Sequence, residues 1–392
     1  MKPWAMLWCA VAFCVSGCAS QSPAQRAPVS ELFHDQLFKA PAAPIDTNAI
    51  FALSDRMRDY LKHNLVHRGA GQDARRALFD ALYTRDQLKL EYDSAMTRNA
   101  AETFDARAGN CLSLVIMTAA LARELNFTVQ FQQIHMDESW SRSGNLYFAA
   151  NHVNLMLGKK RTSYLDGYQV NNANALTVDF IPIPPKARES ARLLEEQTIV
   201  AMYLNNRAAE LLSAGSIDDA YWAARQAVQA DPAFMNAYNT LAVVYQNHGD
   251  QMQAEQTLRY ALRHAPNNTI YLSNLAQTLE SLQRPAEAAA VRERLARLEP
   301  FPPFHFFHLG LEAVNLGDYQ RARSLFEREL ERSPDYHEFH YWLAVSQYQL
   351  GNLRAADKHM RKALENSTTQ GQNALYAAKL DRIRAYEAKV IK

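Results

Sequence analysis

The chain has 392 residues, which is more than one ordinary core holds and enough for two domains with a tail. Hydrophobic residues make up 48% and charged residues 21%, which excludes a disordered chain. Lys plus Arg is 42 against 41 Asp plus Glu, with no long block of one sign, so the clustered basic surface of a nucleic-acid-binding protein is excluded. Only four cysteines are present, and three lie in the first eighteen residues, which excludes a disulfide framework.

Residues 1–17 predict a lipoprotein signal peptide. Lys2 gives a positive start, and the uncharged, mostly apolar run 3–15 is too short to span a bilayer of roughly 30 Å. Val-Ser-Gly at 15–17 before Cys18 resembles the bacterial lipobox, where the signal is cut before the cysteine and its sulfur is lipidated. That resemblance implies acyl chains such as palmitate on Cys18, and Ala19 after it favours an outer-membrane protein that faces the periplasm. The alternative is an ordinary signal peptide with a chance cysteine.

The next stretch, 18–47, predicts a lipidated cysteine followed by a flexible tether. It is rich in Ser, Ala, Gln and Pro, a composition that does not build a core. We expect it to hold the folded part of the protein away from the membrane.

Residues 48–185 predict an α+β domain. Helical spacing of apolar residues indicates helices over 49–65 and 73–88 and a third that starts at Cys111. Alternating apolar residues then predict a strand over 127–134, and a second extended run continues through 157. We expect a turn over 158–161 and a third strand through Asp166.

Three reactive side chains meet in this arrangement. Cys111 opens a helix after a Gly-Asn turn, where the helix dipole favours thiolate over thiol. If the hairpin is centred on Lys159, His152 and Asp166 lie directly opposite each other on one face. A nucleophile, a base and a carboxylate that orients the base are the parts of a thiol acyl-transfer site.

The order cysteine, histidine, aspartate on helix, strand and strand resembles the transglutaminase-like superfamily, relatives of papain-type proteases. The resemblance covers roughly 90–170. It rests on Arg-Ala-Gly-Asn-Cys-Leu at 107–112, Ala-Ala-Leu-Ala-Arg-Glu-Leu at 119–125, the histidine strand, and Tyr-Leu-Asp-Gly at 164–167. It implies Cys111 as nucleophile, His152 as base and Asp166 as the orienting residue, with no cofactor.

Two positions depart from the family pattern, since Asn126 replaces the glycine usual after the helix and Val153 follows the histidine. The backbone amide of Cys111 is the natural oxyanion donor, with Tyr92 as a possible helper. His135 is a competing base. A metal site built from Cys111, His135, His152 and Asp166 lacks a close ligand pair with zinc-site spacing.

Residues 201–368 repeat with a period of 34. Small residues recur at Ala208, Ala220, Ala242, Ala254, Ala276, Ala288, Gly310, Ala322, Ala344 and Ala356, and prolines recur at Pro232, Pro266, Pro300 and Pro334. The pattern resembles five tetratricopeptide repeats without gaps. A connecting helix over 186–200 is expected before the array, and a capping helix over 369–392 after it.

The repeats offer a concave surface for a protein segment or subunit. The apolar positions expected to line it include Phe304, Phe307, Leu311, Tyr341 and Tyr348. The alternative is that these aromatics fill the core of the array.

The expected fold is therefore an α+β transglutaminase-like cysteine domain followed by an all-α tetratricopeptide-repeat solenoid. The expected protein is a membrane-anchored peptidase, amidase or transglutaminase-like enzyme that binds a protein partner or substrate and no nucleic acid. The alternative is a scaffold lipoprotein for envelope assembly whose cysteine domain is inactive.

Overall fold

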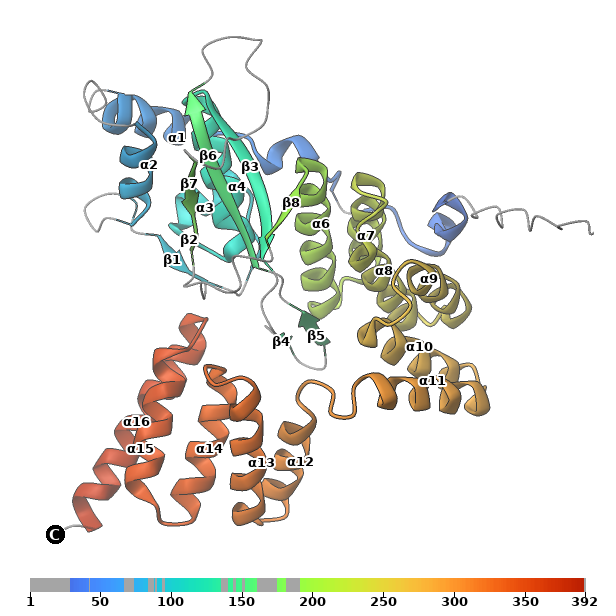
Figure 1. Ribbon diagram of the computed structural model, residues 1–392, viewed down its shortest axis with the longest axis vertical. Helices are drawn as coiled ribbons and strands as arrows, with labels where there is room; N and C mark the ends of the chain where they lie inside the picture. The colour runs from blue at the N-terminus through green and yellow to red at the C-terminus, as the bar shows by residue number, and fades with distance from the viewer. Residues whose placement is uncertain are drawn as a thin grey trace, which may run out of the picture.

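The computed structural model describes residues 29–41, 43–66, 74–83, 88, 90–93, 96–134, 140–143, 146–149, 152–160, 175–180 and 191–390. Short helices around a small antiparallel sheet lead into a long helical array (Figure 1). The expected signal peptide, Cys18, His135 and Asp166 lie outside the described residues. In the part of the chain that the structure describes, no helix is both long and apolar enough to cross a membrane.

The first α-helix of the α+β unit starts later than the predicted helix over 49–65, and α2 lies within the predicted helix over 73–88. A 3-10 turn, η3 (Thr47–Ile50), precedes α1 (Asp55–Tyr60), which continues into the π-helical η4 (Leu61–Val66). α2 spans Ala74–Tyr83 and α3 spans Ala100–Ala106. Apolar side chains from α1, α2 and α3 pack into one core with the helix that carries the cysteine.

The main sheet has four antiparallel strands in the order β7-β6-β3-β8. They are β3 (Phe127–Ile134), β6 (His152–Lys160), β7 (Leu176–Val178) and β8 (Arg192–Leu194). Two small pairs accompany it, the parallel β1 (Glu91–Tyr92) with β2 (Ala108–Gly109) and the hairpin of β4 (Trp140–Ser143) with β5 (Leu146–Ala149).

Helix α4 (Cys111–Glu124) packs against β3 and β6 and forms the centre of this unit. Every residue from 112 to 122 is buried, so the helix is apolar all round and needs cover on all sides. The Asn110 side chain caps its start by accepting a hydrogen bond from the Ser113 amide. Asn126 follows the helix in the left-handed conformation, with a φ of 62°. Asparagine tolerates this conformation, so it can take the place of the glycine expected here.

The predicted hairpin centred on Lys159 is wrong. Lys159 and Lys160 belong to β6, because β3 keeps pairing with this strand as far as the Phe127–Lys160 pair. β6 pairs on its other side with β7, in a register that matches Leu155 with Val178. The return strand therefore arrives from further along the chain than the predicted hairpin requires.

The expected flexible tether is also wrong in part, because residues 29–41 form a segment that docks on the first repeats. It contains the 3-10 turns η1 (Val29–Leu32) and η2 (Asp35–Leu37). Phe38 is buried and stacks on Tyr221, with ring centroids 3.9 Å apart.

Polar contacts fix the same docked segment. The Tyr221 hydroxyl donates to Asp35 Oδ1 at 2.6 Å, and Arg225 Nε lies 2.8 Å from the same oxygen. The Trp222 indole donates to the Lys39 carbonyl at 2.6 Å. The sequence did not predict this contact, because the segment has a Pro-rich composition typical of linkers and its aromatic partners lie about 180 residues further along the chain.

The array is built from paired helices. Their bounds are α6 (Glu196–Ser213), α7 (Ile217–Ala230), α8 (Met235–His248), α9 (Gln251–His264), α10 (Thr269–Ser281), α11 (Pro285–Leu298), α12 (His305–Asn315), α13 (Tyr319–Arg332), α14 (His337–Gln349) and α15 (Leu353–Glu365). The long α16 (Gln370–Val390) follows and buries Tyr376, Leu380 and Ile383 against α15 and α14, as a cap should.

The recurring small residues and turn residues of the repeats have the burial and backbone conformations that their spacing predicts. The recurring small residues are buried between paired helices, and a Cβ on Gly310 would lie 2.5 Å from the Phe326 ring. The turn glycines adopt positive φ, for example 103° at Gly249, and Gln283 adopts the same conformation at 57° in the third repeat.

Two boundaries differ from the prediction. Residues 186–190 of the expected connecting helix 186–200 lie outside the described residues. In the rest of that range, β8 joins the sheet and α6 starts at Glu196. Ile199 and Met202 of α6 belong to the core of the α+β unit, so the first repeat helix serves both parts.

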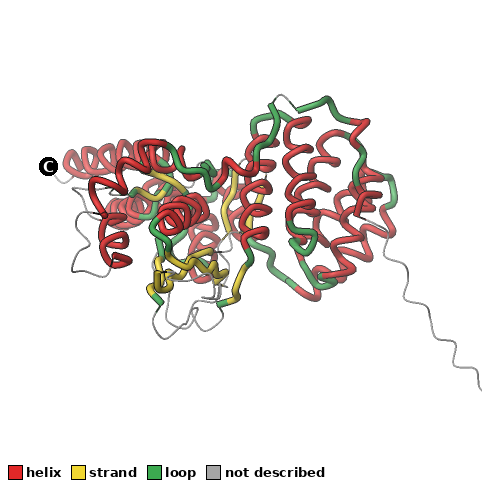
Figure 2. The backbone as a smooth tube through the Cα atoms, turned by 90° about the horizontal axis from the view of Figure 1, so that it is seen from above, coloured by secondary structure: helices red, strands yellow, loops and turns green. Residues whose placement is uncertain are grey.

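The second difference is a break in the array at 299–304. α11 and α12 barely touch, whereas every other pair of consecutive helices from α6 to α16 packs along its length. Three prolines lie in this junction, and Phe304 after them has a φ of 63°. The array therefore consists of a first block, α6–α11, and a second block, α12–α16 (Figure 1). Seen from above, helices gather at both ends of the molecule (Figure 2).

Candidate functional site

The cysteine, the histidine and an acidic residue lie at one edge of the sheet. A short turn joins the end of α4 to the start of β3, and the helix packs back against the strand. The start of α4 therefore lies near the end of β3. Ile134 at that end pairs with His152, the first residue of β6. The β6–β7 register continued by one residue places Asn154 opposite Asp179 at the same edge.

His152 is 3% exposed and faces Asp179. Its Nε2 lies 3.7 Å from Asp179 Oδ1, close enough for a charge interaction but too long for a hydrogen bond. Neither ring nitrogen has a hydrogen-bond partner among the described residues. Asn154 Nδ2 donates to the same carboxylate oxygen and holds it in place.

Cys111 is the first residue of α4 and has a free, half-buried side chain. Burial above all, and to a smaller extent the nearby Asp179 carboxylate, raises the pKa of its thiol to about 11. A hydrogen bond with the Tyr92 side chain and the amide of Cys111 itself act in the opposite direction. The predicted thiolate is therefore wrong for the resting protein, because desolvation outweighs the helix start.

The acidic partner that the structure places beside His152 is Asp179, which sequence reasoning missed. The predicted partner, Asp166, lies outside the described residues and stays a prediction. The only sequence signal for Asp179 is its position directly after an apolar strand, in Leu-Thr-Val-Asp at 176–179. Its register against β6 depends on the intervening chain, which the sequence alone does not specify.

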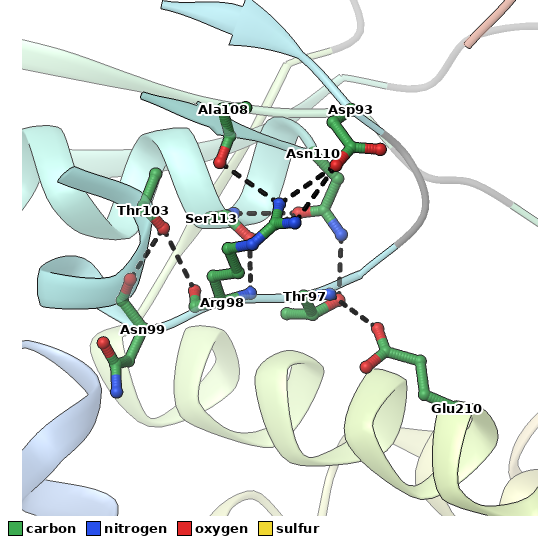
Figure 3. Close-up of polar contacts among 9 residues, drawn as sticks. All are labelled: Asp93, Thr97, Arg98, Asn99, Thr103, Ala108, Asn110, Ser113 and Glu210. Atoms are coloured by element: carbon green, nitrogen blue, oxygen red, sulfur yellow. Dashed lines mark hydrogen bonds and ion pairs between the residues drawn. The ribbon is translucent and has the colours of Figure 1, made fainter. Parts of the chain in front are cut away.

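A polar network fixes the start of the cysteine helix (Figure 3). Asn110 Nδ2 donates to Thr97 Oγ1 at 2.8 Å, and the Arg98 amide donates to Ser113 Oγ at 2.8 Å. The Arg98 guanidinium reaches Asp93 Oδ2 at 3.2 Å. Gly109 is required here, since a Cβ on it would lie 2.8 Å from that of Ser113.

The network extends into the first repeat helix. The Thr97 amide donates to Glu210 Oε1 at 2.7 Å, and Asn206 Nδ2 donates to Thr97 Oγ1 at 3.2 Å (Figure 3 shows Glu210). Thr97 itself is 1% exposed. α6 is thus joined through one threonine to Asn110, the residue immediately before the cysteine.

A cleft of about 370 Å³ opens beside Tyr92, which is 41% exposed. One wall comes from the strands next to the cysteine and the other from the start of α16. The lining residues are Glu91, Tyr92, Asp93, Ala108, Ser367, Thr368, Thr369, Asn373 and Ala374.

The predicted partner-binding aromatics are mostly covered. Phe304 and Phe307 are 2% and 0% exposed inside the core of the second block, so their assignment to a binding surface is wrong and the core alternative holds. Tyr341 and Tyr348 face Tyr376 and Tyr386 of α16. Leu311 packs partly buried against the same core as the phenylalanines.

Among the described residues, no group of three or more His, Cys, Asp or Glu side chains is arranged to hold a metal ion. Two residues of the metal alternative, His135 and Asp166, lie outside that part of the chain.

Comparison with known proteins identifies the repeats. The tetratricopeptide repeat family matches residues 223–256 and 307–371. The TPR repeat-containing protein YvcD of Bacillus subtilis is 24% identical over 229 residues, which cover 55% of this chain and 46% of YvcD. This chain thus matches about half the length of that curated relative.

Several solved structures of TPR proteins resemble part of this chain. YrrB, a TPR protein with an unusual peptide-binding site, is 24% identical, with a TM-score of 0.25, over 46% of this chain and 92% of its own. A thermophilic TPR protein of Thermus thermophilus is 20% identical, with a TM-score of 0.30, over 46% of this chain and 98% of its own. The family matches over 223–256 and 307–371, together with the paired helices, make the C-terminal part an all-α array of tetratricopeptide repeats, a class of module that mediates protein interactions.

Proposed function

We propose that this chain is a thiol hydrolase or acyltransferase, with Cys111 as nucleophile and His152 as base, and that its repeats bind a protein partner or substrate. The observation that carries the proposal is that one carboxylate, Asp179, lies 3.7 Å from His152 Nε2 and also acts electrostatically on the Cys111 thiol. The resemblance to transglutaminase-like domains supports the same roles.

The geometry suggests how the proton moves. Asp179 lies beside Nε2 of His152, so Nε2 carries the proton of the neutral ring and Nδ1 is free to act as base. Nδ1 takes the Cys111 proton as the sulfur attacks a carbonyl carbon, and the imidazolium returns this proton to the leaving amine as the C–N bond breaks. Water or a second amine then attacks the thioester, and its own proton passes back to the thiolate.

The resting thiol fits this scheme if attack and proton transfer are coupled. A pKa of about 11 keeps Cys111 neutral near pH 7, so the protein does not depend on a stored ion pair. The 3.7 Å separation of His152 and Asp179 belongs to a site without substrate, where catalytic hydrogen bonds are often long.

The orienting carboxylate has two candidates. Asp179 is the one that lies beside His152, and Asp166 is the one that the family resemblance implies. We assign the role to Asp179.

The membrane anchor on Cys18 is part of the proposal. Residues 19–28 separate it from the docked segment, and ten extended residues reach at most about 35 Å. Anchoring would therefore hold the first repeats close to the membrane, with the enzyme facing the periplasm.

A soluble chain that begins after Cys18 tests the chemistry when it is mixed with p-nitrophenyl acetate. We expect a stoichiometric release of nitrophenolate and an acetylated Cys111 by intact mass. Hydrolysis or transfer to an added alkylamine then separates hydrolase from acyltransferase. Acetylation that persists at the same rate in Cys111→Ala would contradict the proposal.

The second candidate function is a scaffold with an inert cysteine, and the raised pKa of Cys111 is the observation that favours it. In that case, Cys111 would resist acetylation until the protein is unfolded.

A further inference from the structure

The side-chain amide of Asn110 is fixed at both of its ends (Figure 3). Its Oδ1 accepts hydrogen bonds from the backbone amide and the hydroxyl of Ser113, each at 2.9 Å. A backbone amide can only donate, so the oxygen of Asn110 faces Ser113 and its NH2 group faces Thr97. There Nδ2 donates to Thr97 Oγ1 at 2.8 Å. The bonds with Ser113 cap α4, and the bond with Thr97 fixes the rotation of the group that forms the cap.

Helix α6 holds Thr97 in turn. The Thr97 amide donates to Glu210 Oε1 at 2.7 Å, and Asn206 Nδ2 donates to Thr97 Oγ1 at 3.2 Å. Arg207 Nη1 lies 2.5 Å from the second carboxylate oxygen of Glu210 and fixes it. Thr97 is 1% exposed, so bulk water does not compete for these hydrogen bonds. The position of Asn110 therefore depends on a helix of the repeat array.

Asn110 determines how the nucleophile enters its helix. Its backbone is extended, with a ψ of 172°, and this angle sets the direction of the Cys111 amide. That amide lowers the pKa of the thiol and is the expected oxyanion donor. His152 lies on β6, whereas Asn110 and Cys111 belong to the start of α4. A change at Asn110 would therefore move the sulfur and its amide relative to the base.

Resting on the proposed function, we propose that Thr97 and Asn206 are positioning residues, through which the first repeat helix orients Cys111 for attack. Neither side chain touches the reacting atoms, because both act through Asn110. The cap itself needs only the bonds with Ser113, so the additional bonds to Thr97 serve the orientation of the site. The repeats thus contribute to the chemistry besides binding a partner.

The test compares two reactions of the thiol in the soluble chain that begins after Cys18. With p-nitrophenyl acetate, the sulfur bonds to the acetyl carbon, nitrophenolate leaves and the thiol proton passes to His152. Iodoacetamide alkylates the thiolate with loss of iodide and needs no base. A looser fold changes the access of both reagents alike, so the ratio of acetylation to alkylation at pH 8 isolates positioning.

Matched variants locate the effect. Thr97→Val has the same shape without the hydroxyl and should lower the ratio about tenfold or more, whereas Thr97→Ser should return it to within about threefold of wild type. Asn206→Ala, at a half-buried position where folding is less at risk, should lower the ratio in the same direction. Asn205→Ala, the same truncation at the preceding half-buried position, should leave the ratio unchanged, since the Asn205 side-chain oxygen has no hydrogen-bond partner among the described residues.

The pH profile adds a readout that a loss of stability alone does not move. In the wild type, His152 takes the proton of the neutral thiol, so acetylation should rise less than tenfold per pH unit between pH 7 and 9. In Thr97→Val only the thiolate reacts. Its acetylation should therefore rise about tenfold per pH unit, parallel to alkylation, because the pKa of Cys111 is about 11.

Each outcome decides a different claim. An unchanged ratio in Thr97→Val and Asn206→Ala, or an equal fall in Asn205→Ala, overturns the positioning proposal while acetylation of the wild type leaves the proposed function standing. A fall confined to Thr97→Val excludes α6 from the positioning and overturns its assignment to the repeat helix. A wild type whose Cys111 is not acetylated contradicts the proposed function, and the positioning proposal with it.

Discussion

At the scale of single residues, the chemistry of the site depends on how Cys111 is kept neutral. Burial raises its pKa to about 11, whereas Tyr92 and the helix start lower it. In the proposed reaction, attack by the neutral thiol therefore requires a base. His152 is buried beside Asp179, and neither of its ring nitrogens has a hydrogen-bond partner among the described residues. Buried polar groups without partners are costly to a fold, and such groups cluster at functional sites.

Alkylation with iodoacetamide measures this pKa. Because only the thiolate reacts, the rate should rise about tenfold per pH unit from pH 8 and level off near the pKa of about 11. Tyr92→Phe removes a hydrogen bond that lowers the pKa, so it should slow labelling at pH 9. A plateau below pH 8 in the wild type would show that burial does not control this thiol.

Gly109 should tolerate no side chain, because its Cβ would lie 2.8 Å from that of Ser113 at the start of α4. Gly109→Ala is expected to lower the free energy of unfolding by about 1–3 kcal/mol. Gly371→Ala is the control, since a Cβ there meets nothing within 4 Å, and it should raise helix α16 stability by up to about 1 kcal/mol. Urea denaturation compares each variant with the wild type, and an unchanged midpoint in Gly109→Ala would mean that the start of α4 has room to adjust.

At the scale of elements, the docked segment attaches residues 29–41 to the first block. Leu32 and Phe38 enter the core of that block, and Asp35 pairs with Tyr221 and Arg225. Residues 29–41 of the expected tether are thus a fixed attachment to the repeats and not a flexible linker.

Phe38→Ala should release this segment, since it removes a buried ring that stacks on Tyr221 at 3.9 Å. The expected cost is about 3–5 kcal/mol, as for other buried phenylalanines. Gln36→Ala, exposed on the same segment, is the control. Trp222 reports docking because its indole bonds to the Lys39 carbonyl, so its fluorescence should change only in the first variant. Unchanged emission in Phe38→Ala would contradict fixed docking.

The sequence specifies elements well wherever local pattern decides them. The run from Cys111 to Asn126, strand 127–134 and the 34-residue period all predict what the structure has, because caps, alternation and small-residue spacing are short-range signals. Errors arise where distant segments meet. The register of β6 with β7, the partner of His152 and the docking of residues 29–41 depend on surfaces far along the chain.

At the scale of the whole molecule, a regular repeat period conceals an interruption. The spacing continues through Pro300, but the prolines at 300–303 and the positive φ of Phe304 stop α12 from packing on α11. The first block shares α6 with the α+β core, whereas the second has separate cores. The two blocks should therefore unfold as separate units.

Chains that keep one tryptophan each test this separation, with Trp222 in the first block and Trp342 in the second. Phe326→Ala in the second block should cost about 3–5 kcal/mol and lower the urea midpoint seen by Trp342. The midpoint seen by Trp222 should stay in place. A common shift of both probes would mean that the array unfolds as one unit.

The most direct test of the central claim is the pre-steady-state rate of Cys111 acetylation by p-nitrophenyl acetate in single variants of the soluble chain. His152→Ala should slow it by about 100-fold or more, the usual contribution of a positioned base. Asp179→Asn should slow it by a similar factor because the ring loses its orienting carboxylate, whereas Asp166→Asn should leave it within about twofold of wild type. Unchanged acetylation in His152→Ala would contradict the account, and a loss confined to Asp166→Asn would transfer the orienting role to that residue.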